Sequence, residues 1–214
     1  MYRIQRSLGR FSTASSGMTL VEVIVAIAIM GIVATAAIGL AISSTIGSVS
    51  QQRRAIAVTV ANSAMESISG LPSASLFGGR TPLAVSTSFS NNSGVSGVST
   101  TYQDYDRTLV PGAQTVPIDA PVTQNGTPYT VTSIIGTCFE KLGTNSGQTA
   151  GGDCVRVDSA TYAPLTPVGY TRLTRVIVVV GWTAGQGCAV IGSCVYTIST
   201  LIDSHSDLEW KTNG

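Results

Sequence analysis

The chain has 214 residues, of which only 11% are charged, with a formal net charge of +1 and a mean hydropathy of +0.32. Soluble globular proteins carry about twice that share of charged residues, so the composition favours membrane contact and disfavours a nucleic-acid binder with a broad basic surface. The one histidine, His205, excludes a multi-histidine metal site and a histidine relay. Composition therefore argues against an enzyme, and we assign no catalytic residue, no metal and no cofactor.

The first element in chain order is a long apolar segment. Three arginines lie within the first ten residues, and no charged side chain lies between Glu22 and Arg53. The 20 residues of the range 23–42 are apolar except for one threonine, and a helix of this length spans ~30 Å, the thickness of a bilayer's hydrocarbon core. Short basic flanks stay in the cytoplasm. We therefore expect a single-pass protein of the cytoplasmic membrane, with a transmembrane helix at about 23–42, the N-terminus inside and the C-terminal domain outside.

Three interpretations of this segment compete. Ala34-Thr35-Ala36 has the small-x-small form that a signal peptidase accepts, so a start near Ala37 would make the chain a secreted or anchored binding module. A plain signal anchor is the second interpretation. Neither explains Glu22, because a carboxylate inside an apolar helix is costly and is a functional candidate by default. Charge and periodicity leave open the alternative that Glu22 simply reaches the cytoplasmic interface.

The segment around Glu22 carries a family resemblance. Residues 16–23 read SGMTLVEV, behind a short basic leader and ahead of the uncharged run. This pattern resembles the cleavage site of type IV prepilins and pseudopilins, in which a leader ends in glycine and is followed by an apolar residue, threonine, leucine, a branched apolar residue and glutamate. The resemblance covers about the first 55 residues.

The resemblance implies a set of roles and partners. A prepilin peptidase would cut between Gly17 and Met18 and methylate the new amino group of Met18. Glu22 would neutralise that ammonium on a neighbouring subunit during assembly, because burying either ion alone costs several kcal/mol. The implied partners are membrane lipid before assembly, the inner-membrane assembly platform, and other pilin subunits through the N-terminal helix.

The helix is expected to continue past the bilayer. Apolar residues recur at spacings of three, four or seven and predict a stripe that packs on a sheet; they are Ile46, Val49, Ile56, Val60, Ala64 and Ile68. Gly70-Leu71-Pro72 predicts the end of the helix, with glycine as a left-handed cap. The domains are thus a leader at 1–17, a pilin helix at 18–70 and a β-rich extracytoplasmic domain at 71–214.

The C-terminal domain is expected to contain an antiparallel sheet. Residues 83–101 have no helical period and are interpreted as a long loop with weak strands. Residues 129–139, 172–183 and 195–202 are predicted strands, because they are rich in β-branched residues; Gly185-Gln186-Gly187 would form the turn between the last two. The fold class is therefore α+β, with one long N-terminal helix, half spanning and half amphipathic, packed on this sheet.

Four cysteines, Cys138, Cys154, Cys188 and Cys194, fall on the expected outer side, where disulfides are the default. Three connectivities are open. Cys138–Cys154 with Cys188–Cys194 is the first choice because each pair is local in sequence. Neither spacing fits the two to four residues typical of a zinc knuckle.

Three other polar motifs are interpreted as ordinary surface. Asp104-Tyr105-Asp106 has too few oxygen ligands for calcium. Asp203-Ser204-His205 has no nucleophile motif. Two glycosylation sequons, at Asn91 and Asn125, arise easily by chance.

The sequence therefore predicts a minor pilin or prepilin-like structural subunit of a type IV pilus or related filament, located in the cytoplasmic membrane and then in a cell-surface or periplasmic filament. A pseudopilin of a type II secretion system is the alternative within this class. A binding module released by signal peptidase is the alternative of another class.

Overall fold

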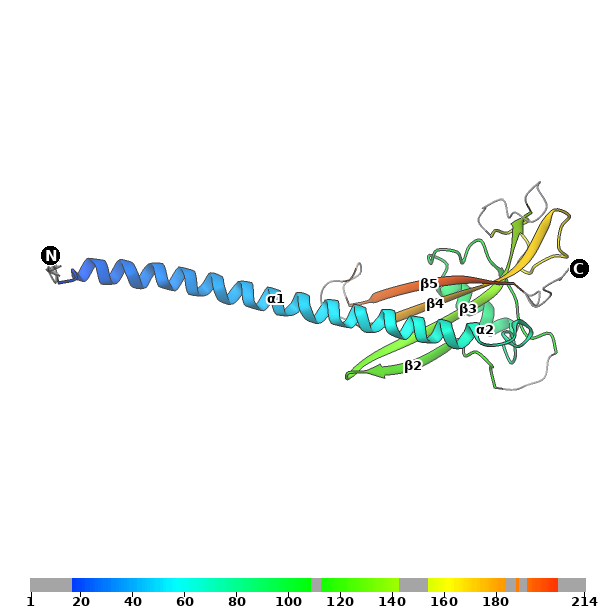
Figure 1. Cartoon of the computed structure of the whole chain (residues 1–214), viewed down its shortest axis with the longest axis horizontal. Coiled ribbons are helices and arrows are strands. Elements are labelled where there is room, and N and C mark those ends of the chain that lie inside the picture. The colour runs from blue at the N-terminus through cyan, green and yellow to red at the C-terminus, as the bar shows by residue number, and fades with distance from the viewer. Residues whose placement is uncertain (1–16, 109–112, 143–153, 184–187, 189–191, 204–214) are drawn as a thin grey trace, which may run out of the picture. The chain divides into compact units, whose positions relative to one another are not determined.

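The computed structural model describes residues 17–108, 113–142, 154–183, 188 and 192–203. The chain divides into two compact units, one that ends at Ile46, called here the apolar unit, and one that begins at Gly47, called here the sheet unit. The elements are α1 (Leu20–Ser69), a 3-10 turn (Ser73–Ser75), α2 (Pro82–Asn91), β1 (Tyr102–Gln103), β2 (Asp119–Gln124), β3 (Thr127–Lys141), β4 (Tyr170–Trp182) and β5 (Cys194–Asp203). The α+β class is confirmed: a long N-terminal helix packs on an antiparallel sheet (Figure 1).

The part of α1 in the apolar unit exposes its side chains all round. Every described residue there is exposed, including Leu20, Met30 and Leu40. Among the described residues, α1 is the helix long and apolar enough to cross a membrane, judged by length and composition. A signal sequence near an N-terminus has the same property, so the identity of the segment depends on its sequence motif.

The end of α1 agrees with the sequence prediction in position but not in mechanism. The helix ends at Ser69, directly before Gly70. The N–H of Gly70 donates to the Glu66 carbonyl at 3.0 Å, which continues the helical pattern. Gly70 does not adopt the left-handed conformation, so the expected left-handed cap is wrong.

In the sheet unit, α1 packs on one face of the sheet. Ala57 and Ala61 are completely buried there, and Ile68 is 4% exposed. Ile56, Val60 and Ala64 of the predicted stripe pack beside them, half-buried, whereas Ile46 and Val49 are exposed. These two small side chains are the fully buried positions of α1 in the core that the helix shares with the sheet.

The sheet is antiparallel, with strand order β1-β3-β4-β5 and β2 on the same side of β3 as β1. Ile134 in β3 lies opposite Ile177 in β4. β2 pairs with the first part of β3 and β1 with a later part, where Tyr102 lies opposite Thr137. The three predicted strands are confirmed in β3, β4 and β5, each with slightly different bounds.

The sequence prediction missed the hairpin between β2 and β3. Asn125 and Gly126 form its two-residue turn, with φ angles of 49° and 73°. Positive φ at both central residues is the mark of the type I′ turn, for which Asn-Gly is the strongest sequence signal. Asn125, considered above only as a glycosylation sequon, therefore has a structural role.

The opposite face of the sheet is covered by α2, and the loop expected over residues 83–101 is wrong in its first half. The side chain of Thr81 accepts a hydrogen bond from the Ala84 N–H at 3.3 Å, and Pro82 occupies the first turn, where its missing N–H costs nothing. Val85 and Phe89 lie one turn apart and are buried with Ile134 and other β-branched residues of the sheet. Tertiary burial thus stabilises a helix whose Ser-rich sequence has little propensity of its own.

Candidate functional site

The predicted cleavage site lies in exposed, non-helical backbone. Gly17, Met18 and Thr19 precede α1 and are exposed. A Cβ at Gly17 would have no atom within 4 Å. A peptide bond that is exposed and outside regular structure is accessible to a peptidase without unfolding of the chain.

Thr19 caps the first turn of α1. Its carbonyl oxygen accepts from the Glu22 N–H at 3.0 Å and from the Val23 N–H at 3.3 Å, and its Oγ1 lies 3.4 Å from the Glu22 nitrogen. Thr-x-x-Glu at a helix start is the pattern of a capping box. A carboxylate in the first turn is also favoured by the helix dipole.

The observed cap uses the backbone N–H of Glu22 and the side chain of Thr19, and the Thr-x-x-Glu spacing was a usable signal for this helix start. Within the described residues Glu22 has no ion-pair partner on its own chain. Its carboxylate is thus accessible to a cation that arrives from outside the chain.

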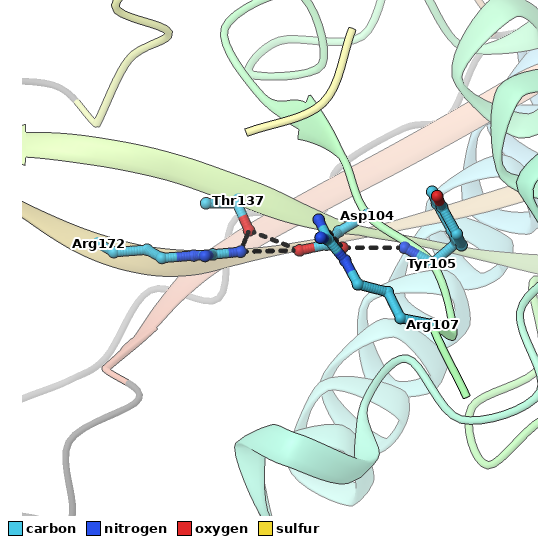
Figure 2. Close-up of polar contacts among 5 residues, drawn as sticks. All are labelled: Asp104, Tyr105, Arg107, Thr137 and Arg172. Carbon is cyan, nitrogen blue, oxygen red and sulfur yellow. Dashed lines mark hydrogen bonds and ion pairs between the residues drawn. The ribbon is translucent and has the colours of Figure 1, made fainter. Parts of the chain in front are cut away.

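A second polar cluster lies in the sheet unit, around Asp104 (Figure 2). The Asp104 side chain is 7% exposed. Its Oδ2 accepts from Arg172 on β4 and from Thr137 on β3, each at 3.0 Å, and its Oδ1 accepts from the Tyr105 N–H at 3.1 Å. Arg107, which is much more exposed, lies 3.7 Å from Oδ1. These contacts hold the segment after β1 against the sheet. The two arginines also neutralise the charge of the buried carboxylate.

The nearby carboxylate of Asp106 faces other partners. Its Oδ2 accepts from the Gly79 N–H at 2.7 Å, and its Oδ1 accepts from the hydroxyl and the N–H of Thr108. The Thr108 hydroxyl, followed by the two backbone donors, lowers the pKa of Asp106 below its ordinary value of 3.8. Since Asp104 and Asp106 are each engaged by donors of the chain, they do not converge on a common cation.

Arg80 is a buried cation that the sequence analysis did not consider. It is 2% exposed, and its guanidinium donates to the carbonyl oxygens of Val116 at 3.2 Å and Ser133 at 3.0 Å. Burial lowers the pKa of Arg80 to about 10, partly opposed by the charge of Asp119. No local sequence signal identifies this contact, because both acceptors are backbone groups distant in the chain.

The expected Cys138–Cys154 disulfide is present in the structure. Cys138 and Cys154 are buried, with Cα atoms 5.4 Å apart, and their disulfide joins β3 to the segment in which Val155 bridges to Phe139. Cys188 and Cys194 have Cα atoms 4.9 Å apart at the start of β5, a distance compatible with the second expected pair, which stays a prediction. In the described part of the chain no group of three or more His, Cys, Asp or Glu residues could hold a metal ion.

Some sequence predictions fall outside the described residues. These are the leader before Gly17, the turn at 185–187, and Ser204 with His205.

Comparison with known proteins agrees with the N-terminal resemblance. The family described as the prokaryotic N-terminal methylation motif matches residues 12–38. The match includes Gly17, Met18 and Glu22 and ends within the apolar unit. No curated protein and no solved structure matches the chain. The motif therefore identifies the N-terminal segment, and the sheet unit has to be interpreted from its own contacts.

Proposed function

From the premise that residues 12–38 carry the type IV prepilin-type signature, we propose that this protein is a minor pilin or prepilin-like structural subunit of a type IV pilus or related filament. The single observation that carries the proposal is the position of the signature. It opens a helix that is exposed and apolar for its first half and whose second half packs on a folded sheet. The role is one of assembly, not catalysis.

The proposal includes a division of the chain into three parts. Residues 1–17 are a leader that prepilin peptidase removes at the Gly17–Met18 bond. Residues 18–70 form the pilin helix, held by membrane lipid at about 23–42 before assembly and by other subunits afterwards. Residues 71–214 form the domain outside the cytoplasmic membrane, consistent with disulfides in an oxidising compartment.

In this proposal Glu22 acts twice. Within one chain it occupies the third position of the capped first turn of α1. Between chains its carboxylate accepts the methylated ammonium of Met18 from a neighbouring subunit as both leave the membrane. Burying either of these two charges alone is unfavourable. The subunits therefore favour the axial register in which the two charges meet.

The first experiment is the intact mass and N-terminal sequence of the protein recovered from membranes and from sheared filaments. The expected result is a chain that begins at N-methylated Met18. A chain that begins near Ala37 would mean release by signal peptidase and would replace the filament subunit with a secreted domain.

The second experiment separates the two roles of Glu22 by comparing Glu22→Gln with Glu22→Ala. Glutamine preserves the capping box but removes the charge. We expect both variants to be cleaved normally and both to enter filaments about tenfold less than the unmodified chain, because the ion pair is lost in both. Immunoblotting of sheared filaments against membranes measures this ratio. Normal incorporation of Glu22→Gln would leave only the capping role.

A deletion strain tests the kind of filament. Loss of pilus retraction or of surface pili, with secretion intact, is expected for a pilus subunit. Loss of protein secretion with normal pili would assign the chain to a type II secretion pseudopilus instead.

A further inference from the structure

The two edges of the sheet differ in how well they are protected. One edge is formed by β1, which is two residues long, and by β2, in which Pro121 has no backbone N–H. A very short edge strand and an edge proline both hinder the addition of a further strand. The other edge is β5, a strand of ten residues without proline or glycine, in which Asp203 at the end is the one charged residue. Of the two edges, β5 is therefore the one open to strand addition.

Over the range 195–202, the outer edge of β5 has backbone groups that no described residue uses. In an edge strand, alternate residues direct their N–H and C=O groups away from the neighbouring strand. Within the described residues, β5 pairs with β4 and with no other strand. No backbone hydrogen bond from outside that ladder reaches this range in the same part of the chain. A strand added beside β5 would supply both the donors and the acceptors.

The side chains of β5 are partly uncovered on both faces of the sheet. Tyr196, Ile198 and Ile202 pack at the margin of the core beneath α1 and are only half-buried. On the opposite face Val195 is 57% exposed and Leu201 is 43% exposed. A neighbouring strand would cover part of both faces and remove apolar surface from water.

The sequence of β5 indicates which strand fits there, because it is self-complementary about Ile198. In an antiparallel pair of two copies centred on that residue, each side chain meets one of similar size or polarity. The opposed pairs are Val195 with Leu201, Tyr196 with Thr200, Thr197 with Ser199, and Ile198 with itself. Such cross-strand pairs stabilise a sheet, whereas like charges directly opposite each other destabilise it.

The neighbouring registers fit less well. With Ile198 at the centre, Asp203 lies opposite the neutral Ser193. A pair centred on Thr197 would place Val195 opposite Ser199, and a pair centred on Ser199 would place Val195 opposite Asp203. Only the central register places the two exposed apolar side chains of the outer face against each other.

We propose that β5 pairs with β5 of a second copy of this chain, antiparallel and centred on Ile198, so that one sheet continues through both molecules. The contact involves one strand from each copy and is smaller than a standard protein interface. The dimer is therefore weak and depends on the concentration of the chain.

The pairing also determines the direction of the two molecules. β5 begins at the end of the sheet where the Tyr129 hydroxyl donates to the Arg53 carbonyl at 3.2 Å, and it runs beside the second half of α1 in the same direction (Figure 1). The two-fold axis of an antiparallel pair reverses this direction in the second copy. Subunits whose helices run parallel in one filament cannot pair in this way. The contact therefore joins copies that face in opposite directions, a conclusion that rests on the proposed function, whereas the pairing itself does not.

Cysteine cross-linking of the full chain in detergent tests both the pairing and its register. Thr197→Cys carries one affinity tag and Ser199→Cys another, and the two variants are mixed and mildly oxidised. Opposed residues have Cα atoms about 4.5–5.5 Å apart, within reach of a disulfide. The diagonal positions that meet in either variant alone lie about 7–8 Å apart. We expect at least about tenfold more disulfide-linked dimer in the mixture than in either variant alone, and none from the unmodified chain, which controls for exchange with the native cysteines.

Three further variants locate the contact. Val195→Lys in the Thr197→Cys chain places a charge opposite Leu201 of the second copy and should lower the yield of dimer at least about fivefold. Thr123→Lys, at an exposed position of β2, is the matched control on the other edge and should leave the yield unchanged. Leu201→Glu in the Ser199→Cys chain should restore the yield with Val195→Lys, because opposite charges then meet. Unchanged melting temperatures verify that each variant is folded.

Contrary results overturn the proposal. They are an absence of dimer in the mixture, equal yields in the mixture and in the single variants, and equal losses from Val195→Lys and Thr123→Lys. Dimer that forms only after deletion of residues 204–214 would mean that the C-terminal segment occupies the edge instead. None of these results concerns the processing of the N-terminus, so the proposed function is tested separately.

Discussion

The apolar unit and the sheet unit use similar side chains in opposite ways. In the apolar unit valine, isoleucine and leucine residues such as Ile32 and Leu40 are exposed on all sides of a single helix. In the sheet unit Val176 and Val178 are completely buried between a helix and neighbouring strands. The first arrangement favours an apolar surrounding, whereas the second supplies its own core. Substitutions should therefore change the folding of the chain in the sheet unit and its interactions with surroundings in the apolar unit.

The largest expected effect is a loss of stability when a glycine of the sheet unit is replaced by alanine, a loss that we do not expect for a glycine of the apolar unit. A Cβ at Gly136 in β3 would collide with the Tyr102 carbonyl oxygen and with the Thr101 side chain, so Gly136→Ala should destabilise the sheet unit by about 4 kcal/mol or more. At Gly31 in α1 nothing lies within 4 Å, and Gly31→Ala should leave the melting temperature unchanged or slightly raised. Thermal melts of the full chain in detergent, followed by circular dichroism, measure both.

Gly181→Ala is the matched control within the sheet. The nearest atom to a Cβ at Gly181 is the Cys194 carbonyl oxygen at 4.0 Å, an ordinary contact. If Gly181→Ala destabilises as much as Gly136→Ala, close approach of β1 is not the cause.

Removal of the Cys138–Cys154 disulfide should cause the next largest loss of stability. Its two cysteines are 16 residues apart, so replacing both by alanine frees a loop that contributes about 3 kcal/mol in the chain-entropy model. Melts of the double variant should show this loss in the sheet unit while the helical signal of α1 persists. An unchanged melting temperature would mean that strand pairing at Phe139 and Val155 is sufficient without the bond.

The Asp104 cluster should contribute less to stability than the disulfide, because the side chain of Arg172 is partly exposed to solvent. Asp104→Ala removes the acceptor of the Thr137 hydroxyl and the ion-pair partner of Arg172, which keeps only its 3.3 Å bond to the Thr137 Oγ1, and should destabilise by about 2 kcal/mol. Arg107→Ala is the control in the same cluster, since its side chain is 63% exposed and should contribute under about 0.5 kcal/mol. Denaturant unfolding of both variants gives the comparison, and equal losses would contradict the assigned geometry.

The smallest effect is a pH dependence. Because the pKa of folded Asp106 lies below its ordinary value of 3.8, its carboxylate contributes stability that is complete above that value. This contribution is lost as pH falls through the lower, folded pKa. Asp106→Asn should therefore melt lower than the unmodified chain at neutral pH and lose less stability on acidification below 3.8. A parallel pH dependence in both proteins would show that Thr108 and Gly79 do not hold the ionised form.

Features specified by local pattern were predictable from the sequence. The end of α1 at Ser69, the strands β3 to β5 and the Cys138–Cys154 pair all follow from periodicity, β-branched runs or short spacing. Two local signals were available but not used: Asn125-Gly126 as a hairpin turn, and Thr81-Pro82 as a helix start. The helix cap by Thr19 was a third.

Other features depend on contacts between distant parts of the chain. Asp104 meets Thr137 and Arg172, which are 33 and 68 residues away. Arg80 binds carbonyl oxygens that any residue type would provide. Neither set of contacts produces a periodic pattern in the sequence, because a single long-range contact requires only one suitable residue at each end.

By itself the sequence determined the apolar helix, its processing motif and the β-rich character of the rest, because these depend on residue type and spacing along one segment. The tertiary structure decided that residues 82–91 are a helix, that Ala57 and Ala61 form the helix–sheet contact, and that β5 lies at an edge of the sheet. The physical reason is that burial depends on which segments meet, and a short segment takes the conformation that buries its apolar side chains best.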